Sequence, residues 1–199
     1  MEEKKLKEIG EMFMTYGVRS VSMDDIARHL GISKKTLYQH FKDKDELVKI
    51  ITESFIEERQ AEYDDVTEKA SNAIEELFLM SKCLRKHFAE INPSLIFDLK
   101  KFHKDAWDVF FDYEHITVFD TIKNNLIKGV KEGYFRNNFD VKVLAKLRVE
   151  QVHMSFDPHV FPKGEFDFTE VQVQMFDHFV YGVLTEKGHK LYEKYKQEN

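Results

Sequence analysis

A short basic segment offers side chains that suit nucleic-acid recognition. Four lysines lie within residues 33–44, where Asp43 is the single acidic residue, so the segment carries a net charge of +3. Lysine reaches guanine acceptors or a backbone phosphate, glutamine pairs with adenine, and a threonine methyl contacts a thymine methyl. A charge run is also often no more than the solvated face of a helix. The elements that carry the segment decide between these two interpretations.

Two short helices joined by a tight turn, a helix-turn-helix, are predicted around this segment. Ser22 and Asp25 have the spacing of a capping box, and Ser33 suits the cap of a second helix. Gly31 supplies the turn, and the small Ala27 suits the point where the helices cross. Apolar residues are available to bury both inner faces; these are Ile26, Leu30, Ile32, Leu37 and Phe41.

The second helix of the motif is predicted to present a polar outer face. Successive residues turn by about 100° in a helix, which places Gln39 directly opposite the apolar edge formed by Leu37 and Phe41. The outward residues are Lys35, Thr36, Tyr38 and Gln39. Lys34 and His40 lie nearer the packed side, so we expect them to contact phosphates. Lys44 begins the next helix, whose N-terminus also favours a phosphate.

Residues 1–50 resemble the N-terminal DNA-binding domain of the TetR family of bacterial transcriptional regulators. The resemblance implies DNA contacts by Thr36, Tyr38, His40 and Lys44, with Gln39 determining specificity. Many members have a small residue at the position of Lys35. Here the lysine either contacts a base or adds a positive charge that attracts the DNA phosphate backbone. The matching residues include Phe13, Gly17, Ser22, Asp25, Ile26, Ala27, Gly31, Ile32, Ser33, Lys34, Thr36, Leu37, Tyr38, Phe41, Lys44, Glu46 and Leu47. The complete set of predicted DNA-binding residues is Ser22, Ser33, Lys34, Lys35, Thr36, Tyr38, Gln39, His40 and Lys44.

The rest of the chain is predicted to be helical, which makes the fold class all-α. Three prolines and eight glycines in 199 residues are too few for the many turns of a sandwich or barrel. We expect a helix-turn-helix domain over residues 1–45 and a larger effector-binding and dimerisation bundle over 46–199. The expected helices cover 6–16, 22–30, 33–41, 43–65, 70–90, one beginning at Pro93, 103–131, 140–156, 168–186 and a tail from Gly188.

The resemblance extends to parts of the larger bundle. Residues 127–140 are similar to the family's junction between a pocket helix and the first dimerisation helix, and residues 94–111 are similar to some members. In the family this part binds a small effector. An apolar stripe from Val173 to Val183 predicts that two helices of each protomer pair with those of a second copy.

Other residue types leave simpler interpretations open. Sixteen of 18 phenylalanines follow residue 50, where they form a core or line a pocket for an apolar or aromatic effector. No histidine is paired at helical spacing with another and no catalytic motif is found, so no metal, cofactor or enzyme activity is expected. Cys83, the single cysteine, fits a small buried apolar residue better than a redox sensor.

Charge and hydropathy complete the functional interpretation. The net charge is −6, but residues 1–50 carry +1 and residues 51–199 carry −7. The charged start lacks a signal peptide and no apolar run is long enough to cross a membrane, so we expect a cytoplasmic protein. The leading hypothesis is a homodimeric repressor that an unknown small-molecule effector releases from an inverted-repeat operator in double-stranded DNA. The alternatives are a DNA-binding protein whose bundle only dimerises, and a helical enzyme.

Overall fold

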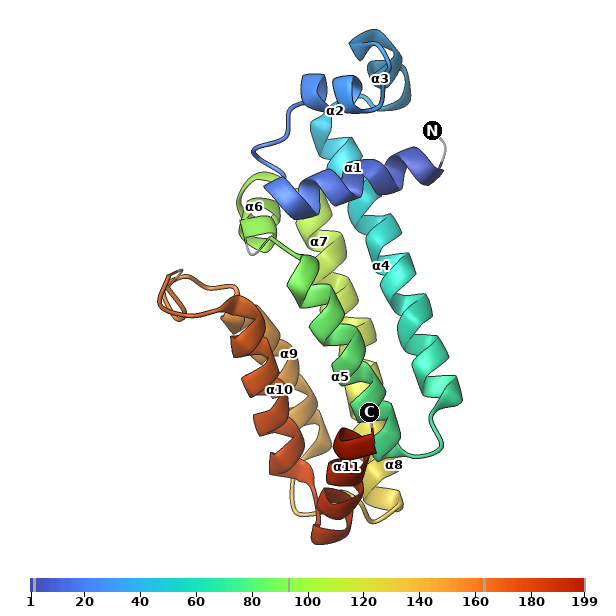
Figure 1. The fold of residues 1–199 in the computed structure, drawn as a ribbon, viewed down its shortest axis with the longest axis vertical. Coiled ribbons are helices and arrows are strands. Elements are labelled where there is room, and N and C mark those ends of the chain that lie inside the picture. The colour runs from blue at the N-terminus through green and yellow to red at the C-terminus, as the bar shows by residue number, and fades with distance from the viewer. Residues whose placement is uncertain (2, 93, 163, 199) are drawn as a thin grey trace. The chain divides into compact units, whose positions relative to one another are not determined.

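The computed structural model describes residues 1, 3–92, 94–162 and 164–198, and these residues confirm the all-α prediction. No strand occurs in the described residues; a single isolated bridge pairs Phe135 with Leu184. The helices in chain order are α1 (Glu3–Tyr16), α2 (Met23–His29), α3 (Lys34–His40), α4 (Lys44–Lys69), α5 (Ala73–Glu90), α6 (Ser94–Phe102), α7 (Lys104–Asp112), the π-helix η1 (Tyr113–Val118), α8 (Phe119–Lys131), α9 (Val141–Ser155), α10 (Phe168–Val183) and α11 (Glu186–Glu198) (Figure 1).

The helices form two compact units. The first comprises residues 1–59 with 90–112, and the second comprises residues 60–89 with 113–199. Helix α4 contributes residues to both units, and α7 of the first unit continues through η1 into α8 of the second. The functional division at residues 45 and 46 remains a prediction, because it concerns which residues bind DNA and which bind an effector.

In the first unit, α6 and α7 are tied to the loop between α1 and α2 and to the start of α4. The amide of Asn92 donates a hydrogen bond of 2.9 Å to the carbonyl of Met14. The carboxylate of Asp98 is buried and accepts a 3.2 Å bond from the amide of Arg19. The Nδ1 atom of His103 lies 2.6 Å from Oδ1 of Asp45. These contacts fix α1, the loop before α2 and the start of α4 relative to α6, and these elements flank α2 and α3 in the sequence.

In the second unit, α9 and α10 pack against each other and share a core with α5, α8 and α11 (Figure 1). Residues with almost no exposed surface fill this core, among them Ile74, Leu126, Val180 and Tyr192. Apolar burial on this scale is the main stabilising contribution to a helical unit.

The apolar stripe on α10 differs in role from its sequence-based interpretation. Phe176, Phe179, Val180 and Val183 are all less than 10% exposed within one protomer, and Val173 is half-buried. The stripe therefore packs into the protomer's own core, and our inference that it must be covered by a second copy was wrong. Any dimer contact has to use another surface.

Most helix boundaries lie within four residues of the predictions: α1 begins at Glu3 rather than residue 6, α4 ends at Lys69 rather than residue 65, and α10 ends at Val183 rather than residue 186. The helix expected from residue 70 begins at Ala73, because Oδ1 of Asn72 accepts the amides of Ile74 and Glu75, each at 3.0 Å. The single helix expected over 103–131 is interrupted by η1, where the backbone pairing widens by one residue. The predicted restart at Pro93 lies outside the described residues.

A buried glycine in α11 provides the clearest stability prediction. A Cβ atom on Gly188 would lie 2.2 Å from the backbone carbonyl oxygen of Tyr134, which cannot move as a side chain can. Gly188→Ala is therefore expected to lower the free energy of unfolding by at least about 2 kcal/mol, measured in urea. The matched control is Gly182→Ala in α10, where a Cβ meets nothing within 4 Å. This change should raise stability by about 0.5–1 kcal/mol, and equal effects of the two substitutions would contradict the prediction.

Candidate nucleic-acid interface

Helices α2 and α3 form the helix-turn-helix through local hydrogen bonds that the sequence spacing predicted. Oγ of Ser22 accepts the amide of Asp25 at 3.2 Å, and the Asp25 carboxylate accepts the amide of Ser22 at 3.0 Å. Oγ of Ser33 accepts the amide of Thr36 at 3.0 Å. Gly31 has a φ of +63°, the left-handed conformation that a tight turn requires. The capping box, the second cap and the turn are all confirmed.

The buried edge of α3 and its exposed Lys35, Tyr38 and Gln39 are as the helical geometry predicted. Thr36, expected on the outer face, is half-buried, whereas Lys34 and His40, expected nearer the packed side, are exposed. Leu37 is fully buried and Phe41 is 4% exposed, whereas Lys35 and Gln39 are exposed and Tyr38 is 44% exposed. The protein therefore exposes an aromatic ring and two polar side chains on one face of a helix. Their contacts with DNA remain predictions.

The two serines and Thr36 have a structural role in addition to the predicted one. The hydroxyls of Ser33 and Thr36 lie 2.8 Å apart and Thr36 is half-buried, so Thr36 is less available to a base than its neighbours. The side chains of Ser22 and Ser33 cap the two helices, as described above. Both serines are exposed at helix N-termini. An added phosphate contact is electrostatically favourable at the N-terminus of α3, whereas Asp24 and Asp25 occupy the first turn of α2.

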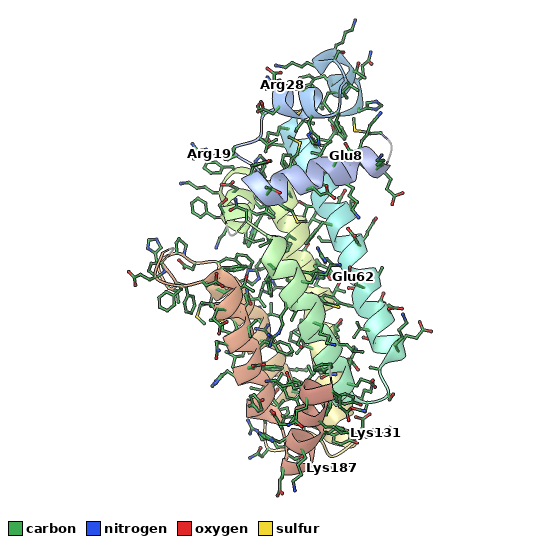
Figure 2. All side chains as sticks on the ribbon, in the orientation of Figure 1. Glu8, Arg19, Arg28, Glu62, Lys131 and Lys187 are labelled. Atoms are coloured by element: carbon green, nitrogen blue, oxygen red, sulfur yellow. The ribbon has the colours of Figure 1, made fainter. Side chains whose placement is uncertain are left out.

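Cations surround the motif, but one of the predicted phosphate ligands is already paired. Nζ of Lys34 lies 2.7 Å from Oδ1 of Asp24 on α2, and this hydrogen bond and charge raise the pKa of Lys34. A phosphate at Lys34 would compete with a carboxylate that the sequence analysis did not single out. Arg28 on α2, labelled in Figure 2, has a side chain that is 79% exposed, and its Nη1 atom lies 3.4 Å from Oδ1 of Asp25. His40 is exposed, as its predicted phosphate contact requires.

Lys44 differs most from its sequence-based interpretation. Its Nζ donates hydrogen bonds of 2.6 Å each to the carbonyl oxygens of Val18 and Val21, in the loop before α2. The side chain is partly buried, and burial lowers the pKa of Lys44. Two of the three ammonium hydrogens therefore hold the protein's own backbone. Lys44 connects α4 to the motif, and its phosphate contact, which has one hydrogen left to use, remains a prediction.

Lys44→Met is expected to lower the free energy of unfolding by about 1–3 kcal/mol, because two carbonyl groups lose a charged donor. Urea unfolding measures this loss. Lys42→Met is the matched control: its side chain is 85% exposed in the same segment, so stability should change by less than about 0.5 kcal/mol. A flatter salt dependence of DNA affinity, by about 0.9 in the logarithmic slope, is the separate signature of a lost phosphate contact. Unchanged stability of Lys44→Met would refute the structural role.

These features define a DNA-binding protein of the helix-turn-helix class. They are the capped helices with their tight turn, the buried apolar side of α3 and its exposed polar face. Residues 6–51 match the family model described as bacterial regulatory proteins, tetR family. Together with the relatives described next, this match supports a DNA-binding transcriptional regulator whose residues 6–51 form a TetR-type helix-turn-helix domain. No helix in the described part of the chain is long and apolar enough to cross a membrane.

Three similar proteins extend the likeness beyond the residues that match the family model. The HTH-type transcriptional regulator YvaF of Bacillus subtilis (strain 168) is 28% identical over 94% of this chain and 97% of that protein. The HTH-type transcriptional repressor KstR2 of Mycobacterium tuberculosis (strain H37Rv) is 29% identical over 68% of this chain and 69% of that protein. A transcriptional regulator from Saccharomonospora viridis, solved in complex with choline, has the same fold, with a TM-score of 0.75 and 16% identity over 92% of this chain and 97% of that one.

Proposed function

We propose that the protein is a repressor that binds an inverted-repeat operator as a homodimer and leaves it when a small molecule binds the second unit. The observation that carries the proposal is the capped motif, in which α3 exposes Lys35, Tyr38 and Gln39 above a buried apolar edge. The similarity to KstR2, which is described as a repressor, supports the direction of regulation. Bacterial DNA lies in the cytoplasm, so we place the protein there.

An exposed apolar face on α9 supports dimerisation. Val143, Leu147 and Met154 are 61%, 49% and 41% exposed, and their spacing places them along one side of the helix. Paired with α10 of each protomer, this face would form a four-helix interface with two-fold symmetry. Two copies carry a formal charge of −12, twice the −6 of one chain, so the acidic bodies should face away from DNA.

Release by an effector requires that the effector bind one conformation more tightly than the other. Helix α4 contributes to both units. In the first unit Asp98 holds the loop before α2 through Arg19, while Asn92 bonds to α1 and His103 to the start of α4. If an effector moved α4 or α6, the distance between the α3 helices of the two protomers in a dimer would change. A coupling free energy of about 1–3 kcal/mol corresponds to roughly 5- to 150-fold weaker DNA binding.

Selection of bound sequences from a random DNA pool tests the proposal. A shared inverted repeat supports a dimeric operator, whereas a single unrepeated half-site would contradict it. Metabolite screening by thermal shift then separates an effector-binding unit from one that only dimerises, because a bound effector raises the melting temperature by mass action. A hit must also weaken operator binding if the release mechanism is correct.

A further inference from the structure

We infer that the effector is an organic anion with an apolar body, whose negative group is bound by Arg148 between α9 and α10 of the second unit. This inference rests on the proposed effector-binding function. Arg148 is 3% exposed, although it carries a full positive charge in a helical bundle. The sequence analysis did not identify it, because one arginine in a helix has no distinguishing spacing.

In the described part of the chain, the guanidinium of Arg148 has no direct ion-pair partner, although Tyr63 and Glu114 act on it favourably from a distance. Among the described residues, its Nη1 atom has no hydrogen-bond partner and no carboxylate forms an ion pair with it. Glu114 contributes a favourable charge from η1, but its carboxylate is paired with Nε2 of His153 at 2.6 Å. On the α10 side, the guanidinium carbon lies 5.3 Å from the centre of the Phe176 ring.

Such a group is costly to keep in the protein interior. Burial lowers the pKa of Arg148 to about 10, so the group stays charged at neutral pH. A buried charge is normally paired and hydrogen-bonded, because removal of one partner leaves a strongly unfavourable isolated ion. A bound anion would supply the missing partner, and arginine is well suited to a carboxylate because its donors match the two oxygens.

Two amide groups accompany Arg148 along the same seam. The Oε1 atoms of Gln151 and Gln172 are buried without hydrogen-bond partners in the described structure, and Gln172 is 1% exposed. Nε2 of Gln172 donates to the hydroxyl of Ser155 at the end of α9. Because a glutamine amide presents an oxygen on one side and two hydrogens on the other, these groups can serve a ligand as donors or as acceptors.

A hollow between α5 and α10 lies next to this seam. Its cavity volume is only about 10 Å³, so a ligand can enter only if the lining side chains move apart; Leu84, Phe88, Val173 and Phe176 provide the apolar lining. Among the side chains that the structure describes, its polar lining consists of Ser81, Arg85 and Gln172. Phe176 lines the hollow and also contacts Arg148, so a displaced Phe176 ring would connect the hollow to the guanidinium. The apolar walls suit a hydrocarbon body, and the two arginines favour a negative head group.

Three probes with the same eight-carbon chain but different charge test the inference: octanoate, 1-octanol and octyltrimethylammonium. Binding to the purified full-length protein is measured by calorimetry and by thermal shift without DNA. Wild type should bind octanoate at least about tenfold more tightly than octanol, as expected for a charge-assisted contact. Octyltrimethylammonium should bind more weakly than octanol, because its charge is repelled by Arg148.

The variant Arg148→Met should bind octanoate and octanol equally, with octanol affinity unchanged within about threefold. It should also fold, because it replaces an isolated buried charge with an apolar side chain of similar length. Arg148→Lys keeps the charge and should retain part of the preference for octanoate. The matched control is Lys146→Met, which removes an exposed cation two residues away on α9 and should leave the preference intact.

Equal binding of octanoate and octanol by wild type, or an undiminished preference for octanoate in Arg148→Met, would overturn the inference. Failure of the proposed function has a different signature. If octanoate binds through Arg148 but leaves operator affinity unchanged, the anion site stands and release by this ligand class is refuted. If octanoate fails to bind while the protein still binds its operator, the anion site is refuted and the DNA-binding function is unaffected.

Discussion

Replacing Gln39 with alanine is expected to remove most of the protein's preference for its best operator over a variant changed at one symmetric base pair. Gln39 is exposed and lies opposite the fully buried Leu37, so its amide points to where the floor of a major groove would be. A bidentate amide contact to a base discriminates by about 1–3 kcal/mol, or roughly 5- to 150-fold. Affinity for unrelated DNA should hardly change, because no charge is removed.

The measurement is a titration of wild type and Gln39→Ala against a panel of operator variants at one salt concentration. Lys35→Ala is the informative comparison, because Lys35 is exposed on the same face but carries a charge. A backbone role for Lys35 predicts equal losses on every sequence and a flatter salt slope. If Gln39→Ala itself weakened binding equally on all sequences, base reading would have to be assigned to Lys35 or Thr36.

Leu147→Glu is expected to convert the protein into a monomer and to weaken operator binding by roughly 10²- to 10⁴-fold. Leu147 is 49% exposed at the middle of the apolar face on α9, so the protomer itself should tolerate a charge there. In a two-fold interface the substitution places two buried carboxylates in apolar surroundings, and neither has a partner. The loss of affinity follows because two linked half-site contacts become two independent ones.

Sedimentation at micromolar concentration tests the change in assembly, and an operator titration tests its effect on binding. Ile127→Glu is the matched control: Ile127 is 51% exposed on α8 of the same unit and does not belong to the α9 face. It should remain dimeric. A dimeric Leu147→Glu protein, or a wild type that is already monomeric, would exclude α9 as the dimer contact.

The helix-turn-helix could be predicted from the sequence because its determinants are local. The bonds between Ser22 and Asp25 and between Ser33 and Thr36 span three residues each, and the Gly31 turn depends on one backbone conformation. The outer face of α3 follows from helical periodicity alone, which is why Lys35, Tyr38 and Gln39 were correctly expected to be exposed. Family resemblance over the same residues agreed with these local rules.

Contacts between distant residues decided the remaining features. Lys44 lies more than 20 residues from Val18 and Val21 in the sequence, so nothing in the sequence indicates that its ammonium group bonds to their carbonyl oxygens. The sequence alone therefore predicts a cation available to DNA. The apolar stripe on α10 was identified from its spacing, but only packing against α5, α8 and α11 shows that the protomer's own core covers it. Arg148 could be predicted least from the sequence. Its burial, and the lack of a hydrogen-bond partner for its Nη1 atom in the described structure, depend on which helices surround the side chain. A sequence specifies periodicity and caps through neighbouring residues, whereas the partner or isolation of a charge depends on which helices the tertiary structure brings together.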